Sequence, residues 1–99
     1  MSYTVRFSLE AKDDIERLFA FLADEDIATA TSALQNIQQA FTLVEEFPFS
    51  CRKAKGDDPF FRELLIQHGR SGYVALFEIE DDKSITVVAI RHQREDDYH

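Results

Sequence analysis

Hydrophobic positions recur along the chain with two different periods, and each change of period marks the boundary of a predicted element. Residues 3–7 alternate apolar and polar side chains, which is typical of a short strand with one buried face. Residues 9–23 follow the helical period instead, with apolar side chains at Ile15, Leu18, Phe19 and Leu22. A second helical pattern runs from Ile27 to Val44 and predicts a helix that ends at Pro48.

Capping residues place the starts of both helices. Ser8 precedes the first helix and Asp26 precedes the second, and their side-chain oxygens can accept hydrogen bonds from the free N–H groups of a first turn. Because only the acidic residues 24–26 separate the two patterns, the helices must run nearly antiparallel as a hairpin. The apolar seam of this hairpin requires a third surface to cover it.

The second half of the chain predicts a sheet. The segment Phe47–Phe60 contains both prolines and a glycine, so we expect a surface loop anchored by phenylalanine at each end. Three β-rich segments follow, separated by turn-like residues, at 61–67, 73–80 and 85–92. The prediction is one α+β domain over residues 1–99: an N-terminal strand and a two-helix antiparallel hairpin, packed on an antiparallel sheet completed by a C-terminal three-stranded meander. The strand order stays open.

The last two strands carry apolar side chains on both faces. One set can cover the helices, namely Tyr73, Ala75, Phe77 and Ile79. A second apolar set is expected on the opposite face and comprises Val74, Leu76, Val88 and Ile90. Since large apolar patches are rarely left open to water, the second face predicts a partner.

Composition agrees with a single packed domain and indicates the cellular compartment of the protein. The 99 residues are 44% hydrophobic, and the one cysteine, Cys51, excludes an intramolecular disulfide and favours a reducing cytoplasm. We expect neither a signal peptide nor a membrane span. Neither a cofactor motif nor a closed set of metal ligands is recognisable, so we expect no cofactor and no metal.

Charge is distributed unevenly along the chain. The net charge is -8, which repels nucleic acid as a whole, but residues 51–75 carry five basic and three acidic side chains. A basic patch is therefore possible in this part, formed by Arg52, Lys53, Lys55, Arg62 and Arg70. A solvated loop explains the same residues equally well.

Three histidines are candidates for acid–base chemistry because imidazole titrates near neutral pH, namely His68, His92 and His99. Nearby arginines could stabilise charge on a phosphate, although hydrogen-bonded surface histidines are the more common interpretation. Cys51 lies beside two basic residues, but no signature marks it as a nucleophile and we assign it no role.

Several segments together resemble a known family. The motifs are Phe61-Arg62-Glu63-Leu64, Gly72-Tyr73-Val74-Ala75-Leu76-Phe77-Glu78 and Val88-Ala89-Ile90-Arg91-His92-Gln93-Arg94. With the helical hairpin before them, they resemble the RelE/ParE superfamily of type II toxin–antitoxin toxins over essentially the whole chain. The resemblance is stronger to the ParE-like, plasmid-stabilisation members, and their fold agrees with the α+β prediction.

The resemblance implies a bacterial, cytoplasmic protein made together with an antitoxin whose C-terminal segment wraps the toxin in a hetero-oligomer. We therefore expect the antitoxin to contact Val74, Leu76, Val88 and Ile90, while a homodimer through the same face is the alternative. Contact with DNA would be indirect, through the antitoxin, because the chain has no basic recognition helix.

The resemblance leaves the cellular target divided between two classes. ParE-like toxins inhibit DNA gyrase without chemistry of their own, which implies target contacts at Arg91, His92, Arg94 and Tyr98. RelE-like toxins are metal-independent, ribosome-dependent mRNA endoribonucleases, for which the candidates are Arg62, Arg91, His92, Arg94 and Tyr98. The acidic residues 95–97 and the net charge favour the gyrase interpretation. A non-toxic, antitoxin-binding co-repressor is a third possibility.

Overall fold

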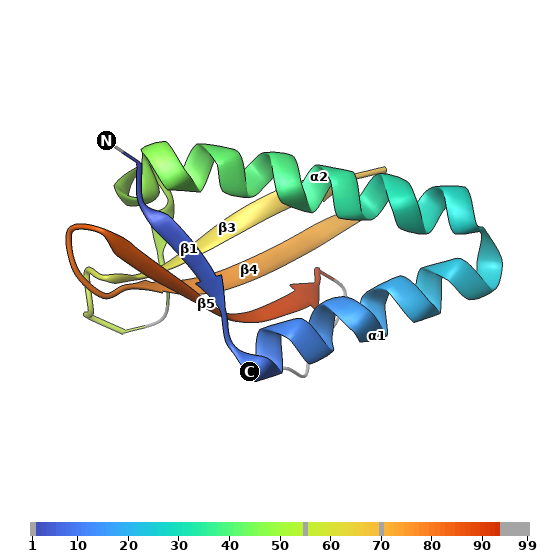
Figure 1. Ribbon diagram of the computed structural model, residues 1–99, viewed down its shortest axis with the longest axis horizontal. Helices are drawn as coiled ribbons and strands as arrows, with labels where there is room; N and C mark the ends of the chain where they lie inside the picture. The colour runs from blue at the N-terminus through green and yellow to red at the C-terminus, as the bar shows by residue number, and fades with distance from the viewer. Residues whose placement is uncertain (1, 55, 70, 94–99) are drawn as a thin grey trace.

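The computed structural model describes residues 2–54, 56–69 and 71–93, which form a two-layer arrangement of helices on a sheet (Figure 1). The chain runs through β1, α1, α2, a 3-10 turn η1 and four further strands. Their bounds are Thr4–Phe7 for β1, Leu9–Glu25 for α1, Ile27–Glu46 for α2, Pro48–Ser50 for η1, Arg52–Lys53 for β2, Phe61–His68 for β3, Ser71–Ile79 for β4 and Ser84–His92 for β5.

The caps of the two helices are those that the sequence predicts. The Ser8 hydroxyl oxygen accepts a hydrogen bond from the Ala11 N–H at 3.0 Å, and Asp26 accepts one from the Ala28 N–H at 3.1 Å. Asp26 also ends α1, because its own N–H donates to the carbonyl of Leu22. One residue thus closes the first helix and opens the second, which makes the hairpin tight.

The five strands form one sheet in the order β1-β5-β4-β3-β2. The strands β3, β4 and β5 are the predicted antiparallel meander, and the short β2 adds to its edge within the segment predicted as a loop. The sheet is mixed rather than wholly antiparallel, because β1 pairs parallel with β5. The α1–α2 hairpin returns the chain to the start of β1, where the Tyr3 N–H donates to the Glu45 carbonyl. The meander that follows has three long antiparallel strands, so its last strand, β5, runs in the same direction as β3 and as β1.

The core lies between the helices and one face of the sheet. Tyr73, Ala75, Phe77 and Ile79 point into it, as predicted, and each is at most 4% exposed. The helices contribute apolar side chains to this core, and the buried ones in contact with the sheet cluster are Ala11, Leu18, Ala33, Ile37, Phe41 and Val44. Burial of this continuous apolar surface supplies the main driving force for folding.

A β-bulge in β5 changes which of its side chains reach the core. Phe77 lies opposite Val87, whereas Leu76 lies opposite Ala89, so Val88 is an extra residue in the ladder. The slip turns Ile90 toward the helices, opposite Ala75, and Ile90 is fully buried. The expected place of Ile90 on the outer face is therefore wrong: a one-residue shift moves a side chain to the other face of a sheet.

Candidate functional site

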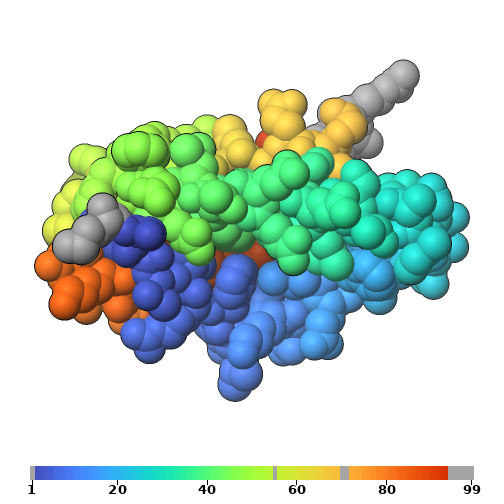
Figure 2. Space-filling model, turned by 45° about the horizontal axis from the view of Figure 1, so that its top comes forward, coloured from blue at the N-terminus to red at the C-terminus, as the bar shows by residue number. Residues whose placement is uncertain are grey.

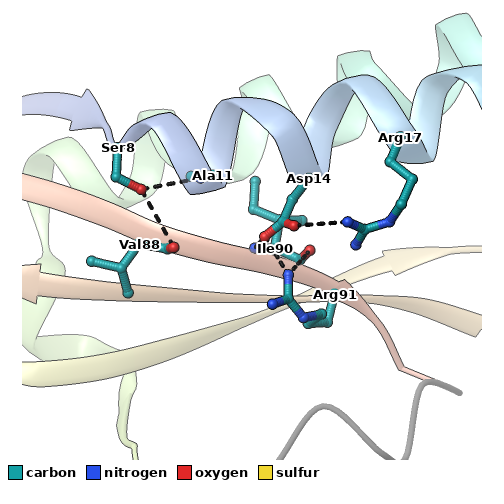
Figure 3. Close-up of polar contacts among 7 residues, drawn as sticks. All are labelled: Ser8, Ala11, Asp14, Arg17, Val88, Ile90 and Arg91. Carbon is teal, nitrogen blue, oxygen red and sulfur yellow. Dashed lines mark hydrogen bonds and ion pairs between the residues drawn. The ribbon is translucent and has the colours of Figure 1, made fainter.

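On the side away from β4, the C-terminal half of β5 has no neighbouring strand among the described residues, and side chains of α1 take the place of one (Figure 3). β1 ends at Phe7, opposite Val87, and the Ser8 N–H then donates to the Val87 carbonyl at 2.9 Å. The Ser8 hydroxyl donates to the Val88 carbonyl at 3.4 Å. Six residues after Ser8, Asp14 accepts a hydrogen bond from the Ile90 N–H at 2.9 Å, so α1 closes this edge of the sheet.

Asp14 is the centre of this region. It is 4% exposed and is the one buried charged side chain among the residues that the structure describes. Its second oxygen accepts a hydrogen bond from Arg17 Nη1 at 3.1 Å, and Arg91 Nη1 forms an ion pair with the same oxygen that accepts from Ile90. Two arginines and one main-chain N–H thereby compensate the buried carboxylate.

The predicted target contact Arg91 is thus already engaged within the molecule. Its guanidinium also donates to the carbonyl of Ile90 at 3.3 Å, while its side chain stays partly exposed. Figure 3 shows this side chain between the end of β5 and Asp14 of α1. Only the nitrogens of the Arg91 guanidinium that make no internal contact can therefore bind a partner.

The structure brings two of the histidines together across a buried tyrosine. Tyr73 lies opposite His92 in the β4–β5 ladder, with ring centroids 5.5 Å apart, and His68 lies 6.0 Å from Tyr73 on the other side. Burial raises the pKa of the Tyr73 hydroxyl, so this group remains protonated at neutral pH. The other candidates at this end, Arg94, Tyr98 and His99, lie outside the described residues, as do Lys55 and Arg70 of the basic patch.

Arg62 lies at the opposite end of the sheet. It faces Phe77, four residues along β4 from Tyr73, which corresponds to about 13 Å along the strands, with one further strand between it and β5. Its guanidinium donates to the main-chain carbonyls of Phe49, Cys51 and Pro59 instead of approaching His92. The structure therefore does not assemble Arg62 with Arg91 and His92 into one catalytic cluster.

The described part of the basic patch is small. Arg52 and Lys53 form β2, next to Arg62 on β3, but Arg52 is paired with Glu63. Burial raises the pKa of the neighbouring Cys51 thiol, and the charge of Arg62 opposes this only in part. A protonated, buried thiol is a poor nucleophile, which agrees with assigning Cys51 no role.

The outer face of the sheet carries a modest apolar strip. Val74 is 5% exposed, and Leu76 and Val88 are half-buried. In Figure 3 the Val88 side chain points away from α1, and Leu65 of β3 lies beside Val74 on the same face and is 44% exposed. Three of the four residues predicted for partner binding thus lie in this strip, and Ile90 does not.

A second candidate surface is a groove on the helical side, which the sequence did not predict. It has a volume of about 340 Å³ and is lined by α1, α2 and β1 through Val5, Phe7, Ile15, Leu34, Ile37, Gln38, Phe41 and Glu45. Figure 2 shows part of the sheet between the two helices. The hydrophobic pattern predicts that the apolar stripes of both helices are buried in the core. It does not show where the two packed helices separate and leave part of these stripes open.

Comparison with known proteins identifies the class to which the fold and these surfaces belong. A model of the ParE toxin of the type II toxin–antitoxin system parDE matches residues 5–97. The chain therefore belongs to the ParE family of type II toxins, within the RelE/ParE superfamily. No curated protein sequence matches it.

Solved structures share the fold at low sequence identity. A chain of the chromosomal ParDE system from P. aeruginosa superposes with a TM-score of 0.70 at 15% identity, covering 92% of this chain and 96% of that one. A chain of the RelBE2 toxin–antitoxin complex from Mycobacterium tuberculosis gives 0.62 at 19% identity, with coverages of 94% and 100%. The conserved hypothetical protein HP0894 from Helicobacter pylori gives 0.55 at 17% identity, with coverages of 94% and 96%.

No helix in the described part of the chain is long and apolar enough to cross a lipid bilayer.

Proposed function

We propose that this chain is a toxin that a cognate antitoxin neutralises and that inhibits DNA gyrase when it is free. The observation that carries the proposal is the match of the ParE family model over residues 5–97. The net charge of -8 supports the same choice, because an mRNA-cleaving toxin must approach a dense phosphate backbone.

Two apolar surfaces support binding of an antitoxin. The groove between α1, α2 and β1 is lined mainly by apolar side chains, which suits the apolar face of a helix, and Glu45 in its lining favours a basic residue there. On the other face, the half-buried Leu76 and Val88 and the exposed Leu65 offer a strip to an extended segment. A segment that wraps from one surface to the other gains affinity from a large contact area although it is disordered beforehand.

The target contact is proposed at the end of β5 and the tail, through Arg91, His92, Arg94 and Tyr98. Arg91 and His92 lie at the last positions of the strand, where the sheet meets the chain terminus. Because Arg91 is held by Asp14, it presents a fixed cation to a partner rather than a mobile one.

A ribonuclease is the second candidate, and one observation favours it. His68 and His92 flank Tyr73, which places two imidazoles, the side chains most often used for acid–base chemistry, at one end of the sheet. Arg62, however, lies too far away to share their substrate phosphate. Among the described arginines, a nuclease would have Arg91 beside these histidines, together with Arg17, which binds the same Asp14 carboxylate.

A purified assay separates the two candidates. The full chain is added to gyrase with supercoiled plasmid, and in parallel to translating ribosomes with a reporter mRNA. We expect loss of supercoiling and accumulation of cleaved plasmid, with intact mRNA, and reversal of both effects by the antitoxin. Cleaved mRNA with normal supercoiling would overturn the proposal in favour of the nuclease.

Truncation after Gln93 tests the role of the tail. The cut leaves the Gln93 N–H hydrogen bond to the Gly72 carbonyl in place, so the end of β5 is preserved. We expect the truncated chain to bind the antitoxin and to lose gyrase inhibition. Full inhibition by the truncated chain would show that the target contact lies elsewhere.

A further inference from the structure

One carboxylate on α1 joins two arginines, Arg17 of the same helix and Arg91 of β5 (Figure 3). Arg91 lies opposite Val74 in the β4–β5 ladder, so its side chain starts on the outer face of the sheet. Its guanidinium nevertheless contacts Asp14, which belongs to the helical layer on the other face. The Arg91 side chain therefore reaches from the outer face to the edge of β5 beside α1.

The internal contacts of Arg91 use one nitrogen of the guanidinium. Nη1 donates to Asp14 Oδ2 and also to the Ile90 carbonyl, the latter at 3.3 Å. Nε and Nη2 have no partner among the described residues, and the side chain is 28% exposed. These two nitrogens share one edge of the planar group and carry parallel donors, which can bind both oxygens of one carboxylate. Asp14 thus determines which edge of Arg91 is available to a partner.

Arg17 balances the charge of Asp14. Its Nη1 lies 3.1 Å from Asp14 Oδ1, the oxygen that Arg91 does not contact. The cluster contains one carboxylate and two guanidinium groups and therefore keeps one positive charge. Asp14 and Arg91 alone would form a neutral pair, which attracts an anionic group less strongly. Within the described part of the chain, the exposed carboxylates Glu10 and Asp13 form no ion pair with either arginine.

We propose that Asp14 and Arg17 are positioning residues for the target contact of Arg91. Asp14 holds the guanidinium so that its Nε–Nη2 edge binds an acidic side chain of the target protein, and Arg17 compensates the charge that Asp14 adds. A long side chain that is fixed before the encounter loses less entropy on binding. The inference rests on the proposed function, which assigns Arg91 to the target. It goes beyond the cover of the β5 edge, because that cover needs only the hydrogen bond from the Ile90 N–H.

A double-mutant cycle on the binding of the purified full chain to gyrase, without DNA, tests the role of Asp14. The variants are Asp14→Asn, Arg91→Lys and D14N/R91K, and Asp13→Asn is the matched control, because Asp13 is an exposed neighbour on α1. We expect binding weaker by about tenfold for each single variant, no further loss in the double variant and no change in the control. Asparagine keeps an acceptor oxygen for the Ile90 N–H, and lysine keeps a charge without the paired donors. Thermal melting verifies that each variant is folded at the assay temperature.

Two variants at Arg17 test the charge compensation. Arg17→Gln should weaken binding by about threefold, because Arg17 is 55% exposed and water screens its charge. Arg17→Lys should restore the affinity, since compensation requires a positive charge and no particular shape. At Arg91 the same replacement by lysine should not preserve binding. A loss of stability alone does not produce this contrast between the two arginines.

Three results would overturn the proposal. The first is an additive loss in D14N/R91K, which would leave Asp14 only the cover of the β5 edge. The second is weak binding of the Arg17→Lys variant. The third is binding that requires added DNA, which would assign the Arg91 edge to a phosphate.

A wild type that neither binds nor inhibits gyrase would instead overturn the proposed target. Growth arrest after induction of the same variants in cells then tests the positioning roles, because it does not depend on which target is bound. We expect Asp14→Asn to reduce the arrest and Asp13→Asn to leave it unchanged. No arrest by the wild type, or equal arrest by the wild type and Asp14→Asn, would overturn the positioning roles as well.

Discussion

An arginine lies near aromatic rings at each end of the sheet, Arg91 at the end of β5 and Arg62 beside β2, but the two side chains make different contacts. At the end of β5, Arg91 pairs with the buried carboxylate of Asp14 and helps α1 to close an open strand edge. At the β2 end, Arg62 donates to three main-chain carbonyls and lies over the ring of the exposed Phe49. Arg91 therefore helps to complete the sheet, whereas Arg62 connects η1 to the segment before β3.

The difference bears on how candidate residues are chosen. Both arginines have the right chemistry for a phosphate, and both were candidates for a nuclease site. Their hydrogen-bond partners show that each guanidinium already has internal contacts and that the two lie at opposite ends of the sheet. Residue type alone therefore overestimates how many cations are available to a substrate.

The largest effect on stability is expected at Ile90, the side chain that the bulge in β5 turns into the core. Ile90→Ala should lower the free energy of unfolding by about 4 kcal/mol, because it removes a fully buried side chain and leaves a cavity. Val88→Ala is the control, since Val88 is only half-buried and should cost about 1 kcal/mol. Urea denaturation measures both. Equal losses in the two variants would mean that the bulge does not direct Ile90 inward.

Removal of the buried carboxylate tests the closed edge. Asp14→Ala leaves the Ile90 N–H and the Arg91 guanidinium without their acceptor, and we expect a loss of about 3 kcal/mol in the free energy of unfolding. Asp13→Ala provides the control, because the neighbouring Asp13 is exposed. Amide hydrogen exchange at Ile90 should also accelerate in the Asp14 variant. An unchanged exchange rate would contradict the role of α1 as an edge cover.

A smaller effect is expected at the opposite end. Arg62→Met keeps much of the apolar stem but removes three hydrogen bonds to partly exposed carbonyls, so we expect a loss of about 1.5 kcal/mol. The rings of Phe49 and Phe60 should become more mobile, which NMR relaxation of their side chains detects. Arg62→Lys restores the charge without the fork of donors and should rescue little. Full rescue by lysine would mean that charge, rather than the hydrogen bonds, holds the Phe49 and Phe60 rings in place.

The smallest effect is expected at an exposed carboxylate in the β4–β5 turn. Hydrogen bonds from the Lys83 and Ser84 N–H groups lower the pKa of Asp81, with the Lys83 contact first among the causes. A lowered folded-state pKa stabilises the native state above the usual value for aspartate, about 3.9, and this contribution disappears as the pH falls through the lowered pKa. The stability gap between wild type and Asp81→Asn should therefore be constant near neutral pH and shrink in acid. A difference in stability between wild type and Asp81→Asn that grows in acid would mean that folding raises the pKa of Asp81 instead of lowering it.

Most of the fold could be predicted from the periods of the hydrophobic pattern. The helices, their caps at Ser8 and Asp26 and the three long strands lie where the sequence places them, because these features depend on neighbouring residues. The two-residue β2 has too few positions to show a period. The parallel pairing of β1 and the bulge at Val88 depend on contacts between distant segments, which a local pattern does not contain.

The site was less predictable than the fold for the same reason. Arg91 and His92 could be selected by residue type, but their partners Asp14 and Tyr73 come from other elements. One signal was present: Asp14 lies three residues after Ala11 and four before Leu18, so a charged residue stands on an apolar stripe. A buried charge at such a position usually has hydrogen-bond partners, and Asp14 has three.

Pulse labelling of DNA and protein synthesis after induction of the chain in cells tests the proposed function most directly. The same cells carrying the antitoxin as well are the control. The account predicts that DNA synthesis stops first and that co-expression of the antitoxin restores it. Protein synthesis that stops first would contradict gyrase inhibition and make the region around His92 and Tyr73 a candidate ribonuclease site.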